Sequence, residues 1–575
     1  MRRRPVLVGL ALAAAISLPS LATGLFADDF TMLLLMEHKV PGPDRSFDLY
    51  CFCDGTTESL ARYVDRGPFP WWSVPHLKLA FLRPLASALL LADHAVFGHE
   101  AVGYHLHSLL WYVLFCAAAA LVLRRALAPP VLALALVLFA LHDSHAMAAG
   151  WISNRHSEVA AALSLFGLAA HMRARTERWR AGWPLSLLGY AAGLTAGETA
   201  LATLGYLVAW ELACRTDALR TRLAALAPAG ILVAGYLALY KWLGYGSWGS
   251  GSYIDPIAEP AAFLRAAPGR VLLLVGGFFG GLPADLVPAR PELGAVIVAT
   301  GFVALVLFGW LLVRAMKRTP PDERRPMAWL VLGAGLALLP TLGGLPGNRL
   351  LLLPSLGGVA VVAVVVRDAW GAWRGTWPGR IALALLLLLE VIRPPVNFLG
   401  TLAAFRHLGV VGQKVAIEME MPPEPIADRD MVVLAASDMS VSLYAAPVRV
   451  VMTDRRARSW WPLSMAAHDH DVVRTGPHTL ELSVVGGRML ERTMETLVRD
   501  PRAHPLVAGD VVALDGLTVR VLDATDGGPT RIEARFARPL DEVWLLEWKD
   551  GRLRHVTLPP EGQPLHLARE PGPLE

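Results

Sequence analysis

Two adjacent carboxylates, Asp28 and Asp29, follow an apolar stretch that runs from Pro5 to Ala27. Adjacent carboxylates repel each other, and both stay ionised only where water, a cation or a hydrogen-bond donor compensates their charge. At the end of a membrane helix such a pair can supply a general base, or it can be an ordinary hydrated helix end. One ordinary helix end accounts for a single Asp more easily than for the pair.

Other polar groups stand at the ends of apolar stretches. His142 and His145 are three residues apart and share a helix face if their turn is helical, which would suit a divalent metal or a phosphate oxygen. Arg349 begins an apolar stretch within GLPGNRLLLLPS, where a permanent cation suits phosphate or snorkels to the interface. The further candidates of this kind are Arg83, Arg155 and Glu198.

Membrane-spanning helices must position these groups, because 54% of the 575 residues are hydrophobic and 18% are charged. This balance excludes a soluble enzyme, and a dispersed net charge of +4 excludes a nucleic-acid surface. About eleven stretches are long enough to cross a bilayer, or nearly so. They lie at or around 5–27, 103–123, 129–147, 156–171, 183–196, 199–214, 223–243, 292–313, 327–346, 350–366 and 381–397.

Arginine and lysine gather in every second connection between these stretches, which the positive-inside rule assigns to the cytoplasm. The N-terminus is then cytoplasmic, and a first loop at 28–101 and a second loop at 244–292 face outward. Val271 to Leu282 is too short to cross and is predicted to be interfacial or re-entrant. Trp71 and Trp72 are typical of an interfacial anchor.

The tail changes character at about residue 400, where runs such as LELSVV and LTVRVLDA alternate between apolar and polar residues. We therefore expect a transmembrane domain at 1–399 and a soluble, β-rich, sandwich-like domain at 400–575. An odd number of spans puts this second domain on the outer face, in a bacterial periplasm. We expect it to fold alone and to contain no catalytic group.

Four segments of the chain resemble the GT-C superfamily of polytopic glycosyltransferases, especially the bacterial relatives of the tetratricopeptide-containing protein O-mannosyltransferases. Together they cover roughly the first two thirds of the chain, and the tail has no tetratricopeptide array. In order, they are ADDF after the first apolar stretch, FLRPLASALLLADHAVFGHEAVGYHLHSLL at Phe81 to Leu110, LFALHDSHAMAAGWISNRHSEVAAALSLF with His142, His145, Trp151 and Arg155, and NRLLLLPSLG with Arg349.

The resemblance implies a GT-C-like fold of about eleven transmembrane helices in the bacterial inner membrane. It also implies transfer of a sugar from a polyprenyl-phosphate-linked donor to a periplasmic acceptor, which is a protein, a lipid or a glycan. In that chemistry a carboxylate takes the acceptor proton and cations hold the departing lipid phosphate. Asp28 would be the base and Asp29 would position acceptor or metal, although the two could be exchanged. The expected phosphate ligands are Arg349, Arg83 and Arg155.

His142, His145 and Glu198 are second candidates for orienting the donor or a divalent cation, so a metal cofactor stays open. Membrane lipids are expected partners and nucleic acid is not. A transporter or flippase for a lipid-linked or anionic substrate is the main alternative, with a non-catalytic envelope-assembly protein as another. Transporters often show inverted repeats and polar groups at mid-span, whereas here the polar groups gather at one boundary.

Overall fold

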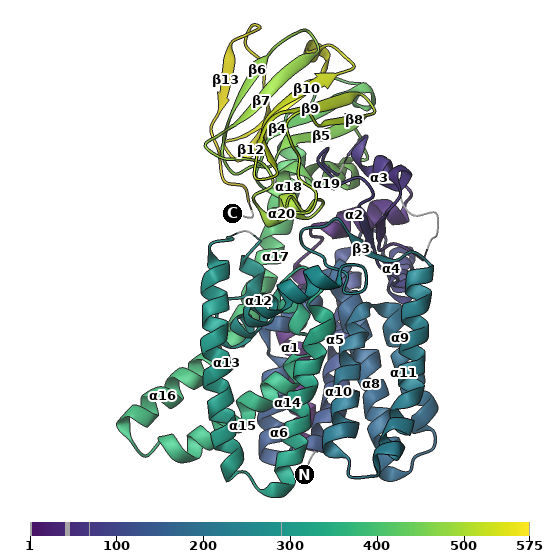
Figure 1. The fold of residues 1–575 in the computed structure, drawn as a ribbon, viewed down its shortest axis with the longest axis vertical. Helices are drawn as coiled ribbons and strands as arrows, with labels where there is room; N and C mark the ends of the chain where they lie inside the picture. Colours follow the sequence, from purple (N-terminus) through teal and green to yellow (C-terminus); the bar gives the residue numbers. More distant parts are fainter. Residues whose placement is uncertain (1–2, 41–46, 68, 289, 574–575) are drawn as a thin grey trace.

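The computed structural model describes residues 3–40, 47–67, 69–288 and 290–573. They form a bundle of helices that is covered at one end by a β-rich part (Figure 1). We call this the capped end of the bundle. Seven helical segments among these residues are long and apolar enough to cross a membrane, or eight if a bent pair counts as one span. The chain is thus a polytopic helical membrane protein with a β-rich C-terminal part.

The seven segments satisfy their backbone hydrogen bonds internally, as lipid demands. They are α1 with η1 (Arg3–Ser17, Leu18–Ala22), α5 (Ala101–Ala126), α11 (Leu219–Trp242), α12 (Pro260–Phe279), α13 (Leu293–Arg318), α15 (Ser355–Trp373) and the continuous run α16, η8 and α17 (Trp377–Leu387, Leu388–Ile392, Arg393–Glu418). The bent pair joins α6 (Pro129–Ala140) to η2 and α7 (Asp143–His145, Ala146–Gly150) at 43°.

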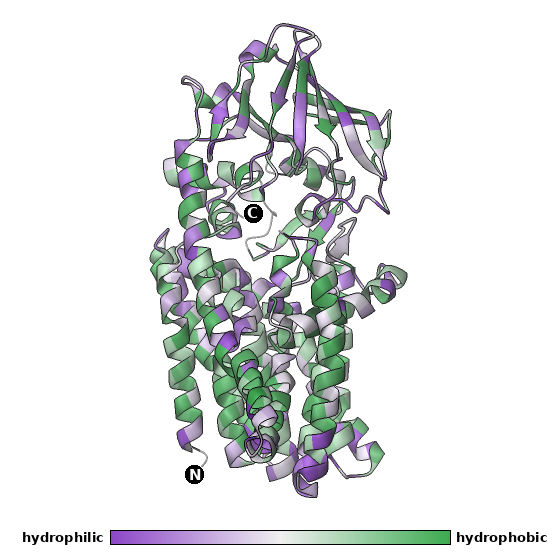
Figure 2. Cartoon of the chain, turned by 90° about the vertical axis from the view of Figure 1, so that its left-hand side faces the viewer, coloured by the Kyte–Doolittle hydropathy of each residue, from purple (hydrophilic) through white to green (hydrophobic). Residues whose placement is uncertain are grey.

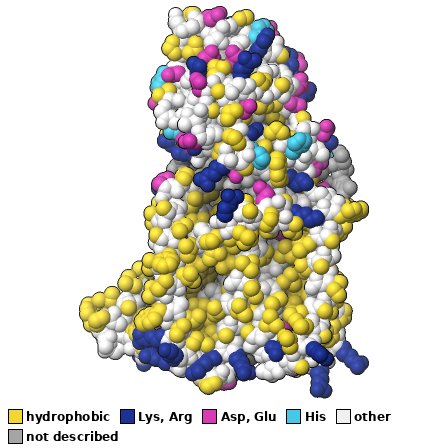
Figure 3. Space-filling model, viewed as in Figure 1, with side chains coloured by type: hydrophobic (Ala, Val, Ile, Leu, Met, Phe, Trp, Pro, Cys, Tyr) yellow, Lys and Arg dark blue, Asp and Glu magenta, His cyan; other side chains and the backbone are white. Residues whose placement is uncertain are grey.

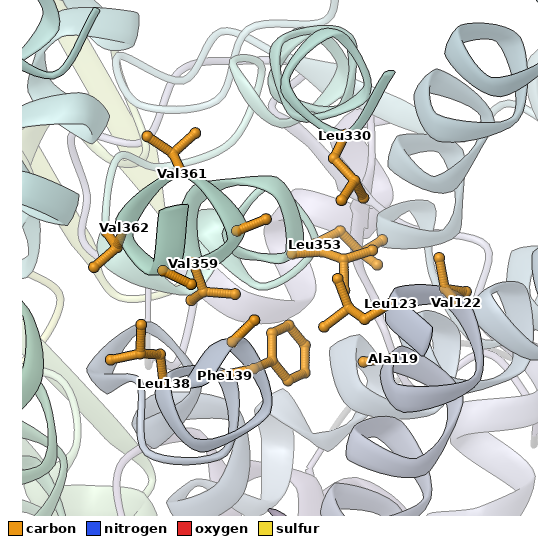
Figure 4. Packing of buried hydrophobic residues seen from close by; sticks show 14 of the residues in the cluster. Ala119, Val122, Leu123, Leu138, Phe139, Leu330, Leu353, Val359, Val361 and Val362 are labelled. Atoms are coloured by element: carbon orange, nitrogen blue, oxygen red, sulfur yellow. The ribbon is translucent and has the colours of Figure 1, made fainter. Parts of the chain in front are cut away.

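Four further helices stand in the same bundle: α8 (Arg155–Glu177), α9 (Gly182–Ala196), α10 (Leu201–Ala209) and α14 (Pro321–Thr341). Their packing is close, since Gly167 and Gly189 bring the backbones of α8 and α9 together and a Cβ on Gly189 would lie 2.8 Å from Gly167 Cα. The middle of the bundle is filled by aliphatic side chains of α5, α6, α14 and α15 (Figure 4). The expected number of eleven spans stays a prediction.

Most of the segment that was expected to be too short to cross, Val271 to Leu282, belongs to α12, a helix of 20 residues that ends at Phe279. Its neighbours in the chain both belong to the capped end. Before it, β3 (Gly246–Trp248) pairs with β2 (Lys78–Ala80) of the first loop. After it, η6 (Ala284–Leu286) carries Asp285, which binds the backbone of Asn348. The helix was missed as a unit because Pro268 and Arg270 interrupt its apolar pattern.

Hydrophobic residues predominate along the helices of the bundle (Figure 2), and on the face shown in Figure 3 basic side chains gather at the end opposite the cap. Helices α5 and α13 end there on Arg124 with Arg125 and on Lys317 with Arg318. Basic residues at helix ends complement the helix dipole, and in membrane proteins they mark the cytoplasmic side.

The capped end begins with a small antiparallel sheet, in which β1 (Cys51–Asp54) and β2 of the first loop pair with β3 of the second loop. Three helices belong to the first loop: α2 (Asp28–Met36), α3 (Thr57–Val64) and α4 (Pro84–Phe97). Pairing between two loops about 170 residues apart in the chain fixes where both lie.

The β-rich part contains a six-stranded antiparallel sheet in the order β13-β6-β7-β10-β9-β8 and a four-stranded sheet in the order β12-β11-β4-β5. Strand β4 pairs in parallel with both β5 and β11. The strands are β4 (Asp430–Ala435), β5 (Ser459–Ser464), β6 (Asp469–Arg474), β7 (Thr479–Val485), β8 (Val511–Leu514), β9 (Leu517–Thr525), β10 (Gly528–Phe536), β11 (Trp544–Lys549), β12 (Arg552–His555) and β13 (Pro564–Leu567), with short helices α18 (Met439–Ser442), α19 (Ala445–Thr453) and α20 (Thr493–Thr496).

The boundary expected at residue 400 lies inside α17, which runs unbroken to Glu418. The β-rich part therefore starts after this helix. Apolar side chains of α17 such as Phe405 continue the helical spacing beyond residue 400, where the tail's strand-like pattern has not yet begun.

Trp71 and Trp72 are not an interfacial anchor, because they are 1% and 0% exposed in the core of the β-rich part. Trp71 Nε1 donates to Leu463 O at 2.9 Å, and Trp72 Nε1 donates to Glu495 O at 3.2 Å. In return, Arg499 Nε donates to Trp72 O at 2.6 Å. The first loop thus supplies part of the core that was expected to belong to the tail alone.

We expect Trp72→Ala to destabilise the capped end by about 3–5 kcal/mol, the usual cost of removing a buried aromatic side chain. The lipid-facing Trp242, which is 80% exposed, provides the control, and Trp242→Ala should cost little. Thermal unfolding of the purified protein followed by limited proteolysis of the β-rich part measures the difference. Equal midpoints for the two variants would contradict the shared core.

Candidate functional site

The acidic pair stands at the first turn of α2, directly after the first span. Ala27 precedes it with a φ of 47°, a region that few non-glycine residues adopt. This backbone turn brings Phe26 N within 3.0 Å of Asp29 Oδ2. The local structure therefore separates the directions of the two neighbouring carboxylates.

Asp29 is 3% exposed and is held by three donors. Its Oδ1 accepts hydrogen bonds from Ser153 N at 2.8 Å and from Ser153 Oγ at 2.6 Å, and its Oδ2 accepts the bond from Phe26 N. Burial raises the pKa of Asp29 to about 7, against the effect of these hydrogen bonds. Asp29 thereby ties α2 to η3 (Ile152–Asn154), the turn before α8.

Asp28 is half-buried and receives a short hydrogen bond from the Tyr444 hydroxyl. Burial raises the pKa of Asp28, while the Tyr444 bond and the positive charge of Arg349 lower it. Its second carboxylate oxygen has no hydrogen bond from the described residues. Of the two acids, Asp28 is therefore the one that can take a proton from a substrate, whereas Asp29 is occupied by the backbone.

Arg349 lies on η7 (Asn348–Leu351) and forms no ion pair within the described part of the chain. Its Nη2 donates to the Tyr253 hydroxyl at 3.4 Å, and its guanidinium carbon is 6.0 Å from the centre of the Trp151 ring. The indole nitrogen of Trp151 is buried without a hydrogen-bond partner among the same residues. A cation without a carboxylate and an unused N–H donor thus stand side by side, as a phosphate group requires.

Asp285 sets the turn that carries Arg349. Both of its carboxylate oxygens accept from Asn348 N, at 3.2 and 3.1 Å, and Asn348 Oδ1 accepts from Ala284 N at 3.1 Å. Burial raises the pKa of Asp285, opposed by the Asn348 hydrogen bond and by the charge of Arg349. Asp285 is therefore a neighbour of Arg349 that binds the backbone of Asn348 and makes no ion pair with the Arg349 guanidinium among the described residues.

Arg83 and Glu198 meet in an ion pair, with Arg83 Nε 2.8 Å from Glu198 Oε2. Arg83 Nη1 also donates to His156 Nε2 at 3.1 Å, and its guanidinium lies over the rings of Tyr50 and Phe81. Glu198 Oε1 accepts from the Tyr240 hydroxyl at 3.2 Å. The two candidates are therefore brought together, but each one neutralises the other.

Arg155 is 2% exposed and forms a close ion pair with Asp93, while its Nη1 donates to Tyr104 O at 3.1 Å. Breaking a buried pair of this kind would leave an uncompensated charge. Arg155 is thus bound within the helix bundle, joining α8 to α4 and α5.

His142 and His145 flank a 3₁₀ turn at the bend between α6 and α7, with ring centres 5.9 Å apart. His142 stacks on Phe278 at 4.4 Å, and His145 Nε2 lies 2.9 Å from Ser355 Oγ. Both imidazoles are at most 3% exposed. No group of three or more His, Cys, Asp or Glu side chains suited to a metal occurs in the residues that the structure describes.

No protein-family model matches the chain, and no curated protein matches its sequence. Among solved structures, the chain is similar to the archaeal oligosaccharyltransferase AglB from Archaeoglobus fulgidus in complex with an inhibitory peptide and a dolichol-phosphate, with a TM-score of 0.43 and 12% identity. That match covers 77% of this chain and 63% of AglB. The chain is also similar to ArnT from Cupriavidus metallidurans bound to undecaprenyl phosphate, with a TM-score of 0.37, 17% identity and coverage of 80% and 89%.

The chain therefore spans a little under two thirds of the length of the archaeal protein. The resemblance to the tetratricopeptide-containing O-mannosyltransferases stays a prediction. We base the functional assignment on the geometry of the site.

Sequence reasoning missed three members of this site: Tyr444, Asp285 and Tyr253. Tyr444 belongs to the tail, which was expected to contain no catalytic group, and its hydroxyl donates to the candidate base. Only Asp285 had a visible signal, as a single carboxylate in the apolar run GGLPADLVPA.

The hydrogen bond from Tyr444 leads to a pH prediction. Because this bond lowers the pKa of Asp28, Tyr444→Phe should raise that pKa, and Asp28 should become protonated at a higher pH than in the wild type. Difference infrared spectra, with Asp28→Asn used to assign the carboxyl band, measure the midpoint. Tyr190→Phe, at a buried tyrosine of α9, is the control and should leave the midpoint unchanged.

Proposed function

We propose that the protein is a GT-C-type membrane glycosyltransferase that moves a sugar from a polyprenyl-phosphate-linked donor to an acceptor hydroxyl or amine. The observation that carries the proposal is the pairing of Asp28, a half-buried carboxylate with a free oxygen, with Arg349, a nearby cation without a carboxylate partner. A base and a phosphate ligand on either side of a sugar are the two groups that this transfer needs.

In the proposed reaction, Asp28 takes the proton of the acceptor as the acceptor oxygen or nitrogen bonds to the anomeric carbon. The bond from that carbon to the phosphate oxygen breaks, and its electrons stay on the departing polyprenyl phosphate. Arg349 stabilises the charge that develops on the phosphate, and the N–H of Trp151 adds a second donor. Asp29 and Asp285 hold the backbone segments that carry these groups.

The proposal departs from the resemblance at several residues. Arg155 is excluded as a phosphate ligand by its buried pair with Asp93. Arg83 is left as a positioning residue because Glu198 neutralises it. The two histidines are packed against aromatic and hydroxyl groups, so we assign them to the support of the bend between α6 and α7.

We place the site on the periplasmic face of the bacterial inner membrane. The support is the gathering of basic residues at the other end of the bundle, together with the position of the acidic pair directly after the first span. A donor delivered by the membrane fits this place, since the lipid carrier can reach the boundary where α1 ends.

The function is tested by mass spectrometry of envelope glycans and lipid-linked sugars in a deletion strain. The strain should lose one sugar decoration and accumulate the corresponding carrier-linked sugar, and wild-type protein should restore both. Asp28→Asn should fail to restore them although it inserts normally, because loss of a general base typically slows turnover about a hundredfold to ten-thousandfold. If the donor accumulated only on the cytoplasmic side, the flippase alternative would replace the proposal.

Asp29→Asn is the matched contrast to this variant. Its amide NH₂ would face a donor in place of a carboxylate oxygen, so we expect lower thermal stability together with lower activity. Asp28→Asn should leave the thermal midpoint unchanged. Full complementation by Asp28→Asn would contradict the assignment of the base.

Phosphate binding by Arg349 predicts a graded loss of donor affinity. Arg349→Lys keeps the charge without the guanidinium fork and should weaken donor binding by about tenfold, whereas Arg349→Ala loses both and should weaken it about a hundredfold. Binding of a polyprenyl phosphate to purified protein in nanodiscs measures the effect. A substitution of the exposed Arg265 of α12 is the control. If both Arg349 variants bound the polyprenyl phosphate as tightly as the wild type, Arg349 would be a snorkelling residue and not a phosphate ligand.

A further inference from the structure

A cleft of about 60 Å³ lies between α2, α3, the end of α17, α19 and the start of β5. Its walls include Leu34, Met421, Pro447 and Trp460, and we call it the arginine pit because four arginines stand around these apolar groups. They are Arg66, Arg449, Arg455 and Arg456. The volume has room for about four to six water-sized groups, which corresponds to one aliphatic side chain.

The arginine pit begins one helical turn from the candidate base. Asp28, Thr31 and Leu34 are spaced by three residues along α2 and are therefore neighbours on one side of it, and the last two line the pit. Leu34 is about 9 Å from Asp28 along the helix axis. The opposite wall is α19, which directly follows Tyr444, the residue that binds Asp28.

The charges around the pit are unbalanced, because its described lining contains no acidic residue. Arg66 and Arg455 pair with carboxylates outside the lining, Asp515 at 3.2 Å and Glu424 at 2.8 Å.

Among the described residues, the other two arginines bind backbone carbonyls and no carboxylate: Arg449 Nη1 donates to Ala416 O, and Arg456 Nη1 donates to Lys39 O, both at 2.9 Å. Burial and the positive charge of Arg66 lower the pKa of Arg456, so two cations stand close together here.

One buried polar atom of a pit residue, Arg449 Nε, lacks a hydrogen-bond partner within the described residues. An unpaired buried donor destabilises a protein unless a ligand satisfies it. The unpaired Arg449 Nε and the apolar walls therefore suit a ligand that carries both a hydrogen-bond acceptor and a small apolar group.

We propose that the arginine pit binds the acceptor, and that the acceptor is a protein segment in which an apolar side chain is flanked by acidic residues. The apolar side chain fills the pit against Leu34 and Trp460, and the carboxylates bind Arg449 and Arg456. The side-chain size of the cleft and the adaptable methionine in its wall favour a peptide over a sugar chain. The inference rests on the proposed function, since it assigns the acceptor of that same reaction.

A groove of about 640 Å³ continues from the pit and shares Arg66 and Arg456 with it. Its lining carries charges of both signs, including Glu58 and Asp515. Acidic side chains are therefore recognised in the pit, while the groove offers room for the rest of an extended segment.

The test uses the purified full-length protein in phosphatidylcholine nanodiscs and a fluorescent pentapeptide, Asp-Glu-Leu-Glu-Asp, followed by anisotropy. We expect this peptide to bind at least tenfold more tightly than Lys-Lys-Leu-Lys-Lys and than the same acidic peptide with serine in place of leucine. The double variant Arg449→Gln, Arg456→Gln should lose at least tenfold in affinity. Arg520→Gln, at an exposed arginine of β9, is the matched control and should bind like the wild type.

A second double variant separates binding from folding. Arg449→Lys, Arg456→Lys keeps both charges and should retain most of the affinity, whereas a purely structural defect would not be rescued by lysine.

Equal binding by the glutamine double variant and the wild type, or equal binding of the acidic and basic peptides, would overturn the proposal. Displacement of the peptide by phosphatidylglycerol vesicles but not by phosphatidylcholine vesicles would also overturn it, in favour of an acidic lipid. The assay needs no sugar donor, so its result is independent of the deletion-strain test. Peptide binding without accumulation of a carrier-linked sugar would refute the proposed function and keep the pit as a peptide site.

Discussion

The hydrogen bonds of the two carboxylates at the start of α2 hold the capped end of the protein to its membrane part. Asp29 accepts from the backbone and side chain of Ser153, which joins α2 to the turn before α8. Asp28 accepts from Tyr444, which joins the same helix to the β-rich part. Because buried carboxylates are costly without donors, each of these contacts restrains where its partner segment can lie.

The same hydrogen bonds distinguish the two acids from each other. Three donors bind Asp29, whereas one carboxylate oxygen of Asp28 has no hydrogen bond from the described residues. Arg349 is left without a carboxylate partner because Asp285, the nearby acid, binds the backbone of Asn348. In contrast, Arg83 and Arg155 are neutralised by Glu198 and Asp93. A cation that the fold does not neutralise is available to a phosphate, and this difference separates three arginines that look alike in the sequence.

The capped end is one folded unit built from three parts of the chain. Strands of the two loops pair with each other, and Trp71 and Trp72 of the first loop complete the core of the β-rich part. The arginine pit lies at this junction, with walls from the first loop, the end of α17 and the tail. A β-rich part that depends on the loop next to the acidic pair is well placed to present an acceptor to it.

The sequence by itself determined that the chain is a polytopic membrane protein with a β-rich tail, because apolar length and alternation are local properties. It also indicated Asp28, Asp29 and Arg349 as candidates, since charges beside apolar stretches stand out in composition. The helix that crosses residue 400, the burial of Trp71 and Trp72, and the contact of Tyr444 with Asp28 were decided only by the tertiary structure. They depend on which distant segments pack together, and a hydrogen bond between residues 416 positions apart leaves no periodic signal in either segment.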